Sequence, residues 1–325
     1  MSDPRRPTAV FLDIDTMGSG DLDTTPLAEA VDGELEIHGG TEPERVIERI
    51  ADAELVFLNK VRLGRRELES APRLGFVGLT ATGVDNIDLE AASELGIVVS
   101  NIRDYCTRSV AQHVTGVMLA LTHRLSEYRA LVAAGDWEQA GNFCLLDYSI
   151  RELCGRRLGI VGYGALGRGV ARVGEALGME PMISERPGAA RVRPDRQPFE
   201  TVLTEADVLS LHCPLTESNR GMIGADELAR MKPDALLINT ARGALVDTAA
   251  LAAALAEGRI AGAAIDVLPQ EPPVDGDPLL EYRGDNLILT PHIAWAARES
   301  RQRAIDELAA NARAWLAGEP RNRVN

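Results

Sequence analysis

Three charged side chains stand just beyond short apolar runs in the second half of the chain: Arg242, Glu271 and His292. Ligands of open α/β sheets bind at the edge where such strands end. A guanidinium can grip a carboxylate and polarise a carbonyl, and an imidazole can pass a proton near pH 7. A carboxylate beside that imidazole orients the ring and raises its pKa. The set suits hydride and proton transfer on a 2-hydroxy or 2-oxo acid.

Each of the three has an ordinary alternative role. Of the five histidines, His292 alone follows a proline at a predicted strand end, which favours it as the proton donor. Arg242 would otherwise be a surface residue that ends a strand, but Gly243 beside it indicates a tight turn that carries the side chain inward. Glu271 has the weakest independent case, because an acidic residue before two prolines is common in loops.

A glycine-rich turn between an apolar strand and a helix predicts a dinucleotide site. Gly162, Gly164 and Gly167, with Ala165 and Leu166 between them, follow Leu158–Val161. In this context the first glycine makes the tight turn, the second lets the backbone approach a pyrophosphate, and the third lets the helix pack on the sheet. The pyrophosphate would lie over the helix N-terminus, where unpaired N–H groups and the helix dipole favour negative charge.

An acidic residue at the end of the next strand bears on which coenzyme is bound. Glu185 would accept hydrogen bonds from the adenosine ribose diol and repel a 2′-phosphate, which favours NAD over NADP. The adjacent Arg186 keeps NADP open, because an arginine at this turn can hold a 2′-phosphate. Lys60 is one of only two lysines in the chain and ends a predicted strand of the first domain. It is interpreted as a substrate contact or as a solvated strand end.

Composition limits the classes of partner. The chain has 325 residues, which predicts two domains at roughly 150 residues each. Its net charge of −15 makes nucleic acid an unfavourable partner. No stretch has the apolar length of a signal peptide core or a membrane helix, so a cytoplasmic protein is expected. The four cysteines lack the spacing of a metal site, and no metal is expected.

Apolar runs alternate with helical patterns along both halves of the chain. The runs 8–13, 55–59, 74–79 and 97–100 predict a first parallel sheet. Six further runs predict a second doubly wound sheet: 158–161, 181–184, 207–211, 235–238, 261–265 and 286–289. Helices are expected over 42–53, 89–95, 109–134 (as one long helix) and 299–317. The predicted substrate domain comprises 1–103 and 294–325, and the predicted nucleotide-binding domain comprises 104–293.

The order of these motifs resembles that of a known family, the D-isomer-specific 2-hydroxyacid dehydrogenases. The likeness covers nearly the whole chain and is carried by Thr82–Asp88, Ser109–His113, the glycine turn, His212–Thr216 and the segments around Arg242, Glu271 and His292. The sequence departs from the pattern at Gln112, where many members carry Glu, and at Glu185, which replaces the commoner Asp.

The resemblance implies a role for each matching residue. Arg242, Glu271 and His292 would be the catalytic set, and Asp266 would hold the nicotinamide carboxamide. Backbone amides around Ala81, Thr82 and Gly83 would bind the substrate carboxylate. Cys213 and Pro214 would line the adenine pocket, and Thr240 and Ala241 would pass beneath the nicotinamide. The implied fold has a flavodoxin-like substrate domain and a Rossmann NAD-binding domain, with the active site in the cleft between them.

Within the family, His292–Trp295 and Phe143–Asp147 look most like the hydroxypyruvate reductase, or glycerate dehydrogenase, branch. We therefore expect an NAD-dependent oxidoreductase that reduces hydroxypyruvate or glyoxylate, with NADP as a further coenzyme. Another small acid such as phosphite is the alternative substrate. A dehydrogenase-fold protein that senses NAD(H) and binds other proteins is the alternative class. Phe143 and Tyr148 lie where family members pair, so a homodimer is expected.

Overall fold

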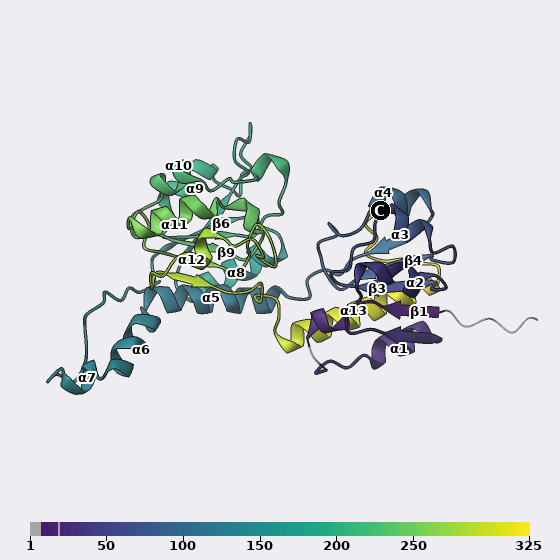
Figure 1. Ribbon diagram of the computed structural model, residues 1–325. Coiled ribbons are helices and arrows are strands. Elements are labelled where there is room, and N and C mark those ends of the chain that lie inside the picture. Colours follow the sequence, from purple (N-terminus) through teal and green to yellow (C-terminus); the bar gives the residue numbers. More distant parts are fainter. Residues whose placement is uncertain (1–7, 19) are drawn as a thin grey trace, which may run out of the picture. The chain divides into compact units, whose positions relative to one another are not determined.

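The computed structural model describes residues 8–18 and 20–325 (Figure 1). The chain divides into two compact units. Unit 1 comprises Met1–Cys106 and Ala296–Asn325, and unit 2 comprises Thr107–Trp295. Each unit contains one parallel sheet with helices packed on it, which confirms the prediction of two parallel-sheet α/β domains. Within the described part of the chain, no helix combines the length and apolar character needed to cross a bilayer.

Unit 1 has a five-stranded sheet in the order β2-β1-β3-β4-β5. This is the flavodoxin-like strand order, and it reverses between β1 and β3. The strands are β1 Thr8–Phe11, β2 Glu34–Ile37, β3 Leu55–Leu58, β4 Phe76–Leu79 and β5 Val98–Ser100. The helices are α1 Thr25–Val31, α2 Val46–Ile50, α3 Arg65–Glu69, α4 Leu89–Glu94 and α13 Arg298–Leu316, with short 3-10 turns at Ile14–Met17 and Pro43–Arg45.

An aromatic series joins the sheet of unit 1 to its C-terminal helix. The ring centroids of Phe11 and Phe57 are 6.4 Å apart, and those of Phe57 and Phe76 are 6.3 Å apart. Phe76 then lies 5.5 Å from Trp315 of α13. Offset and edge-on aromatic contacts of this kind add to the apolar burial that holds the helix on the sheet.

Unit 2 has a six-stranded sheet in the order β11-β10-β9-β8-β6-β7. The strands are β6 Arg157–Val161, β7 Glu180–Ser184, β8 Val208–Leu211, β9 Leu236–Asn239, β10 Gly262–Ile265 and β11 Leu287–Leu289. The helices are α5 Thr107–Thr122, α6 Leu125–Ala134, α7 Asp136–Gln139, α8 Ala165–Ala176, α9 Phe199–Glu205, α10 Ala225–Arg230, α11 Thr248–Ala256 and α12 Pro278–Glu281, with 3-10 turns at Glu217–Asn219 and Gly243–Leu245.

The strand order of unit 2 reverses at β6, because β7 pairs with one side of β6 and β8 with the other. Beyond β7, Gln197 forms a single parallel bridge with Ser184 and takes the place of a further strand. With that bridge counted, the order matches the Rossmann arrangement, in which the ligand binds where the order reverses. The central strands β8, β9 and β10 are buried along their whole length, as expected for a sheet covered on both faces.

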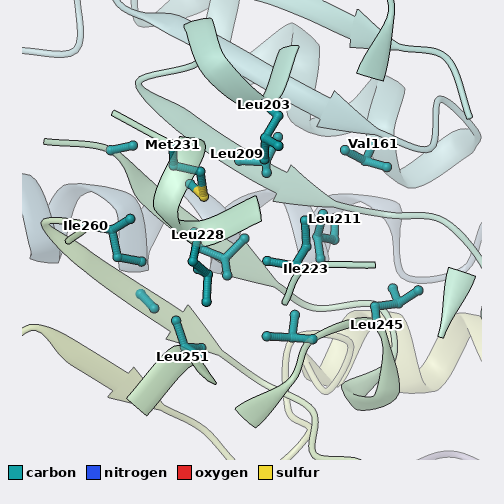
Figure 2. Packing of buried hydrophobic residues seen from close by; sticks show 14 of the residues in the cluster. Val161, Leu203, Leu209, Leu211, Ile223, Leu228, Met231, Leu245, Leu251 and Ile260 are labelled. Atoms are coloured by element: carbon teal, nitrogen blue, oxygen red, sulfur yellow. The ribbon is translucent and has the colours of Figure 1, made fainter. Parts of the chain in front are cut away.

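Aliphatic side chains fill one core of unit 2 (Figure 2). Leu209 and Leu211 of β8 and Leu203 of α9 are completely buried in this cluster, together with Leu251 of α11. These side chains anchor the strands at whose ends the candidate functional residues lie.

Among the differences from the sequence predictions are a missed edge strand and a helix that is broken in two. No strand was predicted at β2, whose residues are mostly exposed at the sheet edge and therefore lack an apolar run. The single helix predicted over 109–134 is wrong, since α5 ends at Thr122 and α6 begins at Leu125. The Thr122 carbonyl accepts the Arg151 N–H at 3.2 Å, and Arg124 adopts a left-handed conformation with φ of 54°. A contact from a distant part of the chain thus accompanies the break.

Candidate active site

The glycine turn between β6 and α8 has the geometry that its three glycines require. Gly162 has φ of +97°, and a Cβ there would lie 2.5 Å from the Cys213 nitrogen. A Cβ on Gly167 would lie 2.1 Å from the Gly162 oxygen, so any side chain would push the helix off the turn. A Cβ on Gly164 would meet no atom within 4 Å, so this glycine faces open space.

The start of α8 can therefore receive an anion. Gly164 is the N-cap residue of this 12-residue helix and offers no side chain to its first N–H groups, and Ala165 and Leu166 form the first turn. The turn lies at the carboxyl end of β6, where the strand order reverses. Open space at Gly164 and an uncapped helix end fit a pyrophosphate. Cys213 and Pro214 follow the neighbouring strand β8.

Two further polar atoms near these strand ends are buried without a hydrogen-bond partner among the described residues. They are the hydroxyl of Thr240, just after β9, and Nδ1 of His212, just after β8. Ala241 is buried, and its N–H donates to the Asn239 side chain, which shapes this turn. The unpaired Thr240 hydroxyl is a group that a bound nicotinamide coenzyme would satisfy. Burial lowers the pKa of His212 to about 4, so its imidazole is neutral at pH 7.

Three candidate residues follow three adjacent strands of the same sheet. Arg242 comes after β9, Asp266 directly after β10, and His292 after β11. These strands are neighbours in the order β11-β10-β9 and run parallel. Because parallel strands end at one edge, the topology gathers the three residues there.

His292 and Glu271 form a direct hydrogen-bonded pair. The His292 Nδ1 lies 2.6 Å from Oε2 of Glu271, whose Oε1 accepts the Leu268 N–H at 2.9 Å. About a third of each side chain is exposed to solvent. A charge-assisted contact of this length fixes the orientation of the ring and leaves the second ring nitrogen, Nε2, for another partner.

The backbone at His292 is in the left-handed region, with φ of 55°. The His292 N–H donates to the Asp266 carbonyl at 2.7 Å, and its own carbonyl accepts the Trp295 indole N–H at 2.9 Å. A non-glycine residue keeps this conformation only when its surroundings hold it there. The loop therefore presents His292 in one defined position.

The buried carboxylate of Asp266 holds that loop. One oxygen accepts the Thr290 hydroxyl at 2.5 Å and the Ile293 N–H at 2.9 Å, and the other accepts the Ala294 N–H at 2.9 Å. Asp266 was singled out for a contact with nicotinamide, whereas its internal bonds point first to positioning of the His292 loop. Sequence reasoning missed this role because the bonded N–H groups carry no residue signature.

The turn that carries Arg242 packs tightly against the segment that carries Glu271. A Cβ on Gly243 would lie 1.9 Å from the Leu268 carbonyl carbon, so only glycine fits there. The Asn239 side chain donates to the Arg242 carbonyl at 2.9 Å, and the Arg242 Nη1 donates to the Ala241 carbonyl at 2.7 Å. The position of Arg242 is thereby tied to the loop that holds Glu271.

The remaining substrate-binding candidates belong to unit 1. The main-chain N–H of Lys60 donates to the buried Asp13 carboxylate at 2.6 Å, just after β3. Ala81, Thr82 and Gly83 lie in the loop after β4, where Thr82 donates its hydroxyl to the Ile102 carbonyl at 2.9 Å. Both loops extend from carboxyl ends of strands in that sheet, the edge at which ligands of such sheets bind.

Comparison with known proteins agrees with this geometry. Residues 115–294 match the family model described as D-isomer specific 2-hydroxyacid dehydrogenase, NAD binding domain. A glycerate dehydrogenase from Methylorubrum extorquens is 45% identical over 282 residues, which cover 87% of this chain and 88% of that protein. The chain belongs to the D-isomer-specific 2-hydroxyacid dehydrogenase family.

Other members of this dehydrogenase family match along nearly their whole length. A hydroxypyruvate reductase from Blautia hydrogenotrophica is 36% identical, with coverage of 97% of this chain and 99% of that protein. The solved NADPH-dependent glyoxylate/hydroxypyruvate reductase from Sinorhizobium meliloti, in complex with NADP and malonate, superposes with a TM-score of 0.78. It is 29% identical and covers 98% of this chain and 97% of its own. The chain is an NAD-binding oxidoreductase of the hydroxypyruvate reductase branch.

In this dehydrogenase the Glu185 carboxylate makes a contact that the sequence analysis did not predict. Glu185 follows β7 as predicted, but its carboxylate is paired with Arg193. The stretch 186–198 was interpreted only as a loop rich in proline and arginine. Its four arginines were the one signal that could have indicated a partner for Glu185.

Proposed function

We propose that this chain uses a nicotinamide coenzyme to reduce hydroxypyruvate to D-glycerate or glyoxylate to glycolate. The observation that carries the proposal is the 2.6 Å contact between His292 Nδ1 and Glu271, at the strand edge that also carries Arg242. A histidine oriented by a carboxylate is a suitable proton donor to a carbonyl oxygen. The names of the relatives support the same substrates.

In this proposal His292 is the general acid and Glu271 is its positioning carboxylate. NADH, when bound, would supply the hydride for the reduction of the 2-oxo acid at C2. Nε2 of protonated His292 gives its proton to the carbonyl oxygen, so that the alkoxide becomes a hydroxyl. Glu271 accepts the hydrogen bond from Nδ1 and holds the ring in one orientation, with Nε2 free to face the substrate.

Arg242 is proposed to bind the substrate carboxylate and to polarise its carbonyl group. A guanidinium presents paired donors that match the planar carboxylate, so one contact both binds and orients the acid. Lys60 and the backbone amides around Ala81, Thr82 and Gly83 are proposed to complete the grip on the acid.

The proposed coenzyme contacts follow the turns at the carboxyl ends of the second sheet. Gly162, Gly164, Ala165, Leu166 and Gly167 would hold the pyrophosphate. Cys213 and Pro214 would line the adenine pocket, Thr240, Ala241 and Asp266 would contact the nicotinamide end, and Glu185 would stand at the adenosine ribose.

The decisive experiment follows NADH and NADPH oxidation at 340 nm with hydroxypyruvate, glyoxylate, pyruvate, 2-oxoglutarate and 3-phosphohydroxypyruvate. Fast turnover of hydroxypyruvate or glyoxylate is expected. His292→Ala should lower kcat by at least about a hundredfold, the usual contribution of a general acid, while NADH still binds. Tight NADH binding without turnover of any acid would instead favour the NAD(H)-sensing alternative.

We also propose that the chain works as a homodimer. The segment 125–150 contains α6 and α7, which project from the rest of unit 2 in Figure 1. It exposes Phe143 (91%), Leu146 (82%) and Trp137 (51%), an apolar surface unusual on a monomer. Sedimentation analysis should find a dimer, and Phe143→Asp should shift it toward monomer. Leu280→Asp, on the exposed face of α12, is the matched control and should leave the dimer intact.

A further inference from the structure

The carboxylate of Glu185 is buried and already occupied at the end of β7. Oε2 accepts the Arg193 Nε–H at 2.7 Å, and Oε1 accepts the Arg193 Nη2–H at 2.5 Å. The main-chain N–H groups of Arg186 and Arg193 add contacts of 3.0 and 3.3 Å. Only 5% of the Glu185 side chain is exposed, against 50% of the Arg193 side chain.

This pairing changes what Glu185 can do at the adenosine ribose. A carboxylate at this position ordinarily accepts hydrogen bonds from the two ribose hydroxyls and repels a 2′-phosphate. Here both oxygens are held by a bidentate guanidinium, so the ribose diol must compete with Arg193. The Arg193 hydrogen bonds lower the pKa of Glu185 to about 2, which keeps the carboxylate charged and the pair intact at neutral pH.

The loop that delivers Arg193 is fastened to the strand edge. Glu185 N–H donates to the Gln197 carbonyl, and Gln197 N–H donates to the Ile183 carbonyl, each at 2.8 Å. Between these anchors the chain forms no helix and carries Arg186, Arg191, Arg193 and Arg196. Arg196 bonds the Ser184 carbonyl at 3.3 Å, and its Nε is a buried donor without a partner among the described residues.

Arginine therefore dominates the charge at the end of β7. Arg193 uses two of its five side-chain N–H donors on Glu185, and its exposed remainder can meet a second acceptor. The exposed Arg186 directly follows Glu185. A dianionic phosphate monoester matches paired guanidinium donors better than a neutral diol does.

We propose that Arg193 sets the coenzyme specificity of this chain by neutralising Glu185, so that the site accepts the 2′-phosphate of NADPH. The inference rests on the proposed function, because it assigns the adenosine end of the same coenzyme site. Arg193 is a specificity-determining residue that both masks the carboxylate and offers donors to the phosphate. Without Arg193, the unpaired carboxylate of Glu185 repels the 2′-phosphate of NADPH and accepts hydrogen bonds from the ribose hydroxyls of NADH.

The test measures dissociation constants for NADH and NADPH by coenzyme fluorescence on the full chain, without substrate. Calorimetry with AMP and adenosine 2′,5′-bisphosphate isolates the contribution of the 2′-phosphate. Arg193→Ala should weaken NADPH binding by about tenfold, the scale of a lost charge-assisted contact. NADH binding should hold or tighten. Arg191→Ala removes the same charge from the same loop and should change either constant by less than about twofold.

A double variant distinguishes a change in coenzyme specificity from a general disruption of the loop that carries Arg193. In the double variant Arg193→Ala with Glu185→Gln, the repelling carboxylate is gone, and NADPH affinity should recover in part. An unchanged NADPH to NADH ratio in Arg193→Ala, or equal effects of Arg193→Ala and Arg191→Ala, would overturn the inference alone. Failure of the wild-type chain to bind either coenzyme would overturn the proposed function and this inference with it.

Discussion

Replacement of Gly243 by alanine tests how the active site is assembled. Gly243 follows Arg242 and begins a 3-10 turn, and its α-carbon faces the main chain at Leu268. The Leu268 N–H in turn bonds Glu271, which holds His292. One added methyl group therefore acts on the junction between the Arg242 turn and the loop that orients the proposed acid.

The size of the effect follows from the distance. The added Cβ would lie 1.9 Å from the Leu268 carbonyl carbon, whereas ordinary contacts begin at 3.4 Å. The two segments must therefore separate by about 1.5 Å (3.4 − 1.9). A misplacement of about 1 Å costs roughly a hundredfold in rate when reacting groups must be aligned. We expect kcat to fall about a hundredfold, with a loss of roughly 1–3 kcal/mol in the free energy of unfolding.

The assay compares kcat with hydroxypyruvate, NADH affinity and thermal unfolding for wild type and Gly243→Ala. NADH affinity should fall by much less than kcat, because the proposed pyrophosphate turn follows β6, which β8 separates from β9, and only the proposed nicotinamide contacts of Thr240 and Ala241 lie beside the altered turn. Gly116→Ala is the control. Gly116 is exposed in the middle of α5, and a Cβ there meets no atom within 4 Å. This variant should keep its activity and gain about 0.5–1 kcal/mol in stability.

Wild-type kcat in a folded Gly243→Ala protein would refute the reasoning. It would mean that the Arg242 turn and the Glu271 loop need not be held together for catalysis. A loss of NADH binding as large as the loss of kcat would also contradict it, because the damage would then extend beyond this junction.

Three further predictions concern single side chains. Glu271→Gln should lower kcat by about tenfold or more and leave NADH affinity unchanged, because the amide keeps the shape of the side chain but lacks the charge beside Nδ1. An unchanged kcat would show that Glu271 does not position His292 for catalysis. In Asp266→Asn the side-chain amide group, which is a donor, would face a backbone N–H that now donates to the carboxylate. Thermal stability and kcat should therefore both fall. A variant as stable as wild type would contradict the role of Asp266 in holding the loop. His212 has a folded pKa of about 4, below its unfolded value of 6.5, so its contribution to stability is complete above pH 6.5 and is lost as the pH falls toward 4. Urea unfolding should therefore find up to about 3 kcal/mol of pH dependence in wild type that His212→Gln lacks.

Much of the fold could be predicted because buried parallel strands consist of short apolar runs. β3, β8 and β9 lie where such runs stand in the sequence. The edge strand β2 was missed because its side chains are largely exposed. The break between α5 and α6 was missed because the apolar spacing continues across it, while the bond from Arg151 to the Thr122 carbonyl comes from a remote segment.

The sequence pointed to the residues of the candidate site but not to most of the contacts among them. Gly162, Gly164 and Gly167 have the conformations and surroundings that their spacing predicts. The pair of Glu271 and His292 was expected from residue type, and the structure brings the two into contact. The hydrogen bonds by which Asp266 holds the His292 loop were not predicted, because most of the donors are main-chain N–H groups, which carry no signal of residue type.

The sequence by itself determined the two parallel-sheet domains, the glycine turn and the residue types of a 2-hydroxyacid dehydrogenase. These depend on local patterns, namely apolar runs, glycines with required conformations and charged residues after strands. Only the tertiary structure decided that Gly243 locks the Arg242 turn against Leu268 and that Arg193 covers Glu185. Both contacts are set by packing distances and by the direction in which a side chain points, and neither of these leaves a periodic pattern in the sequence.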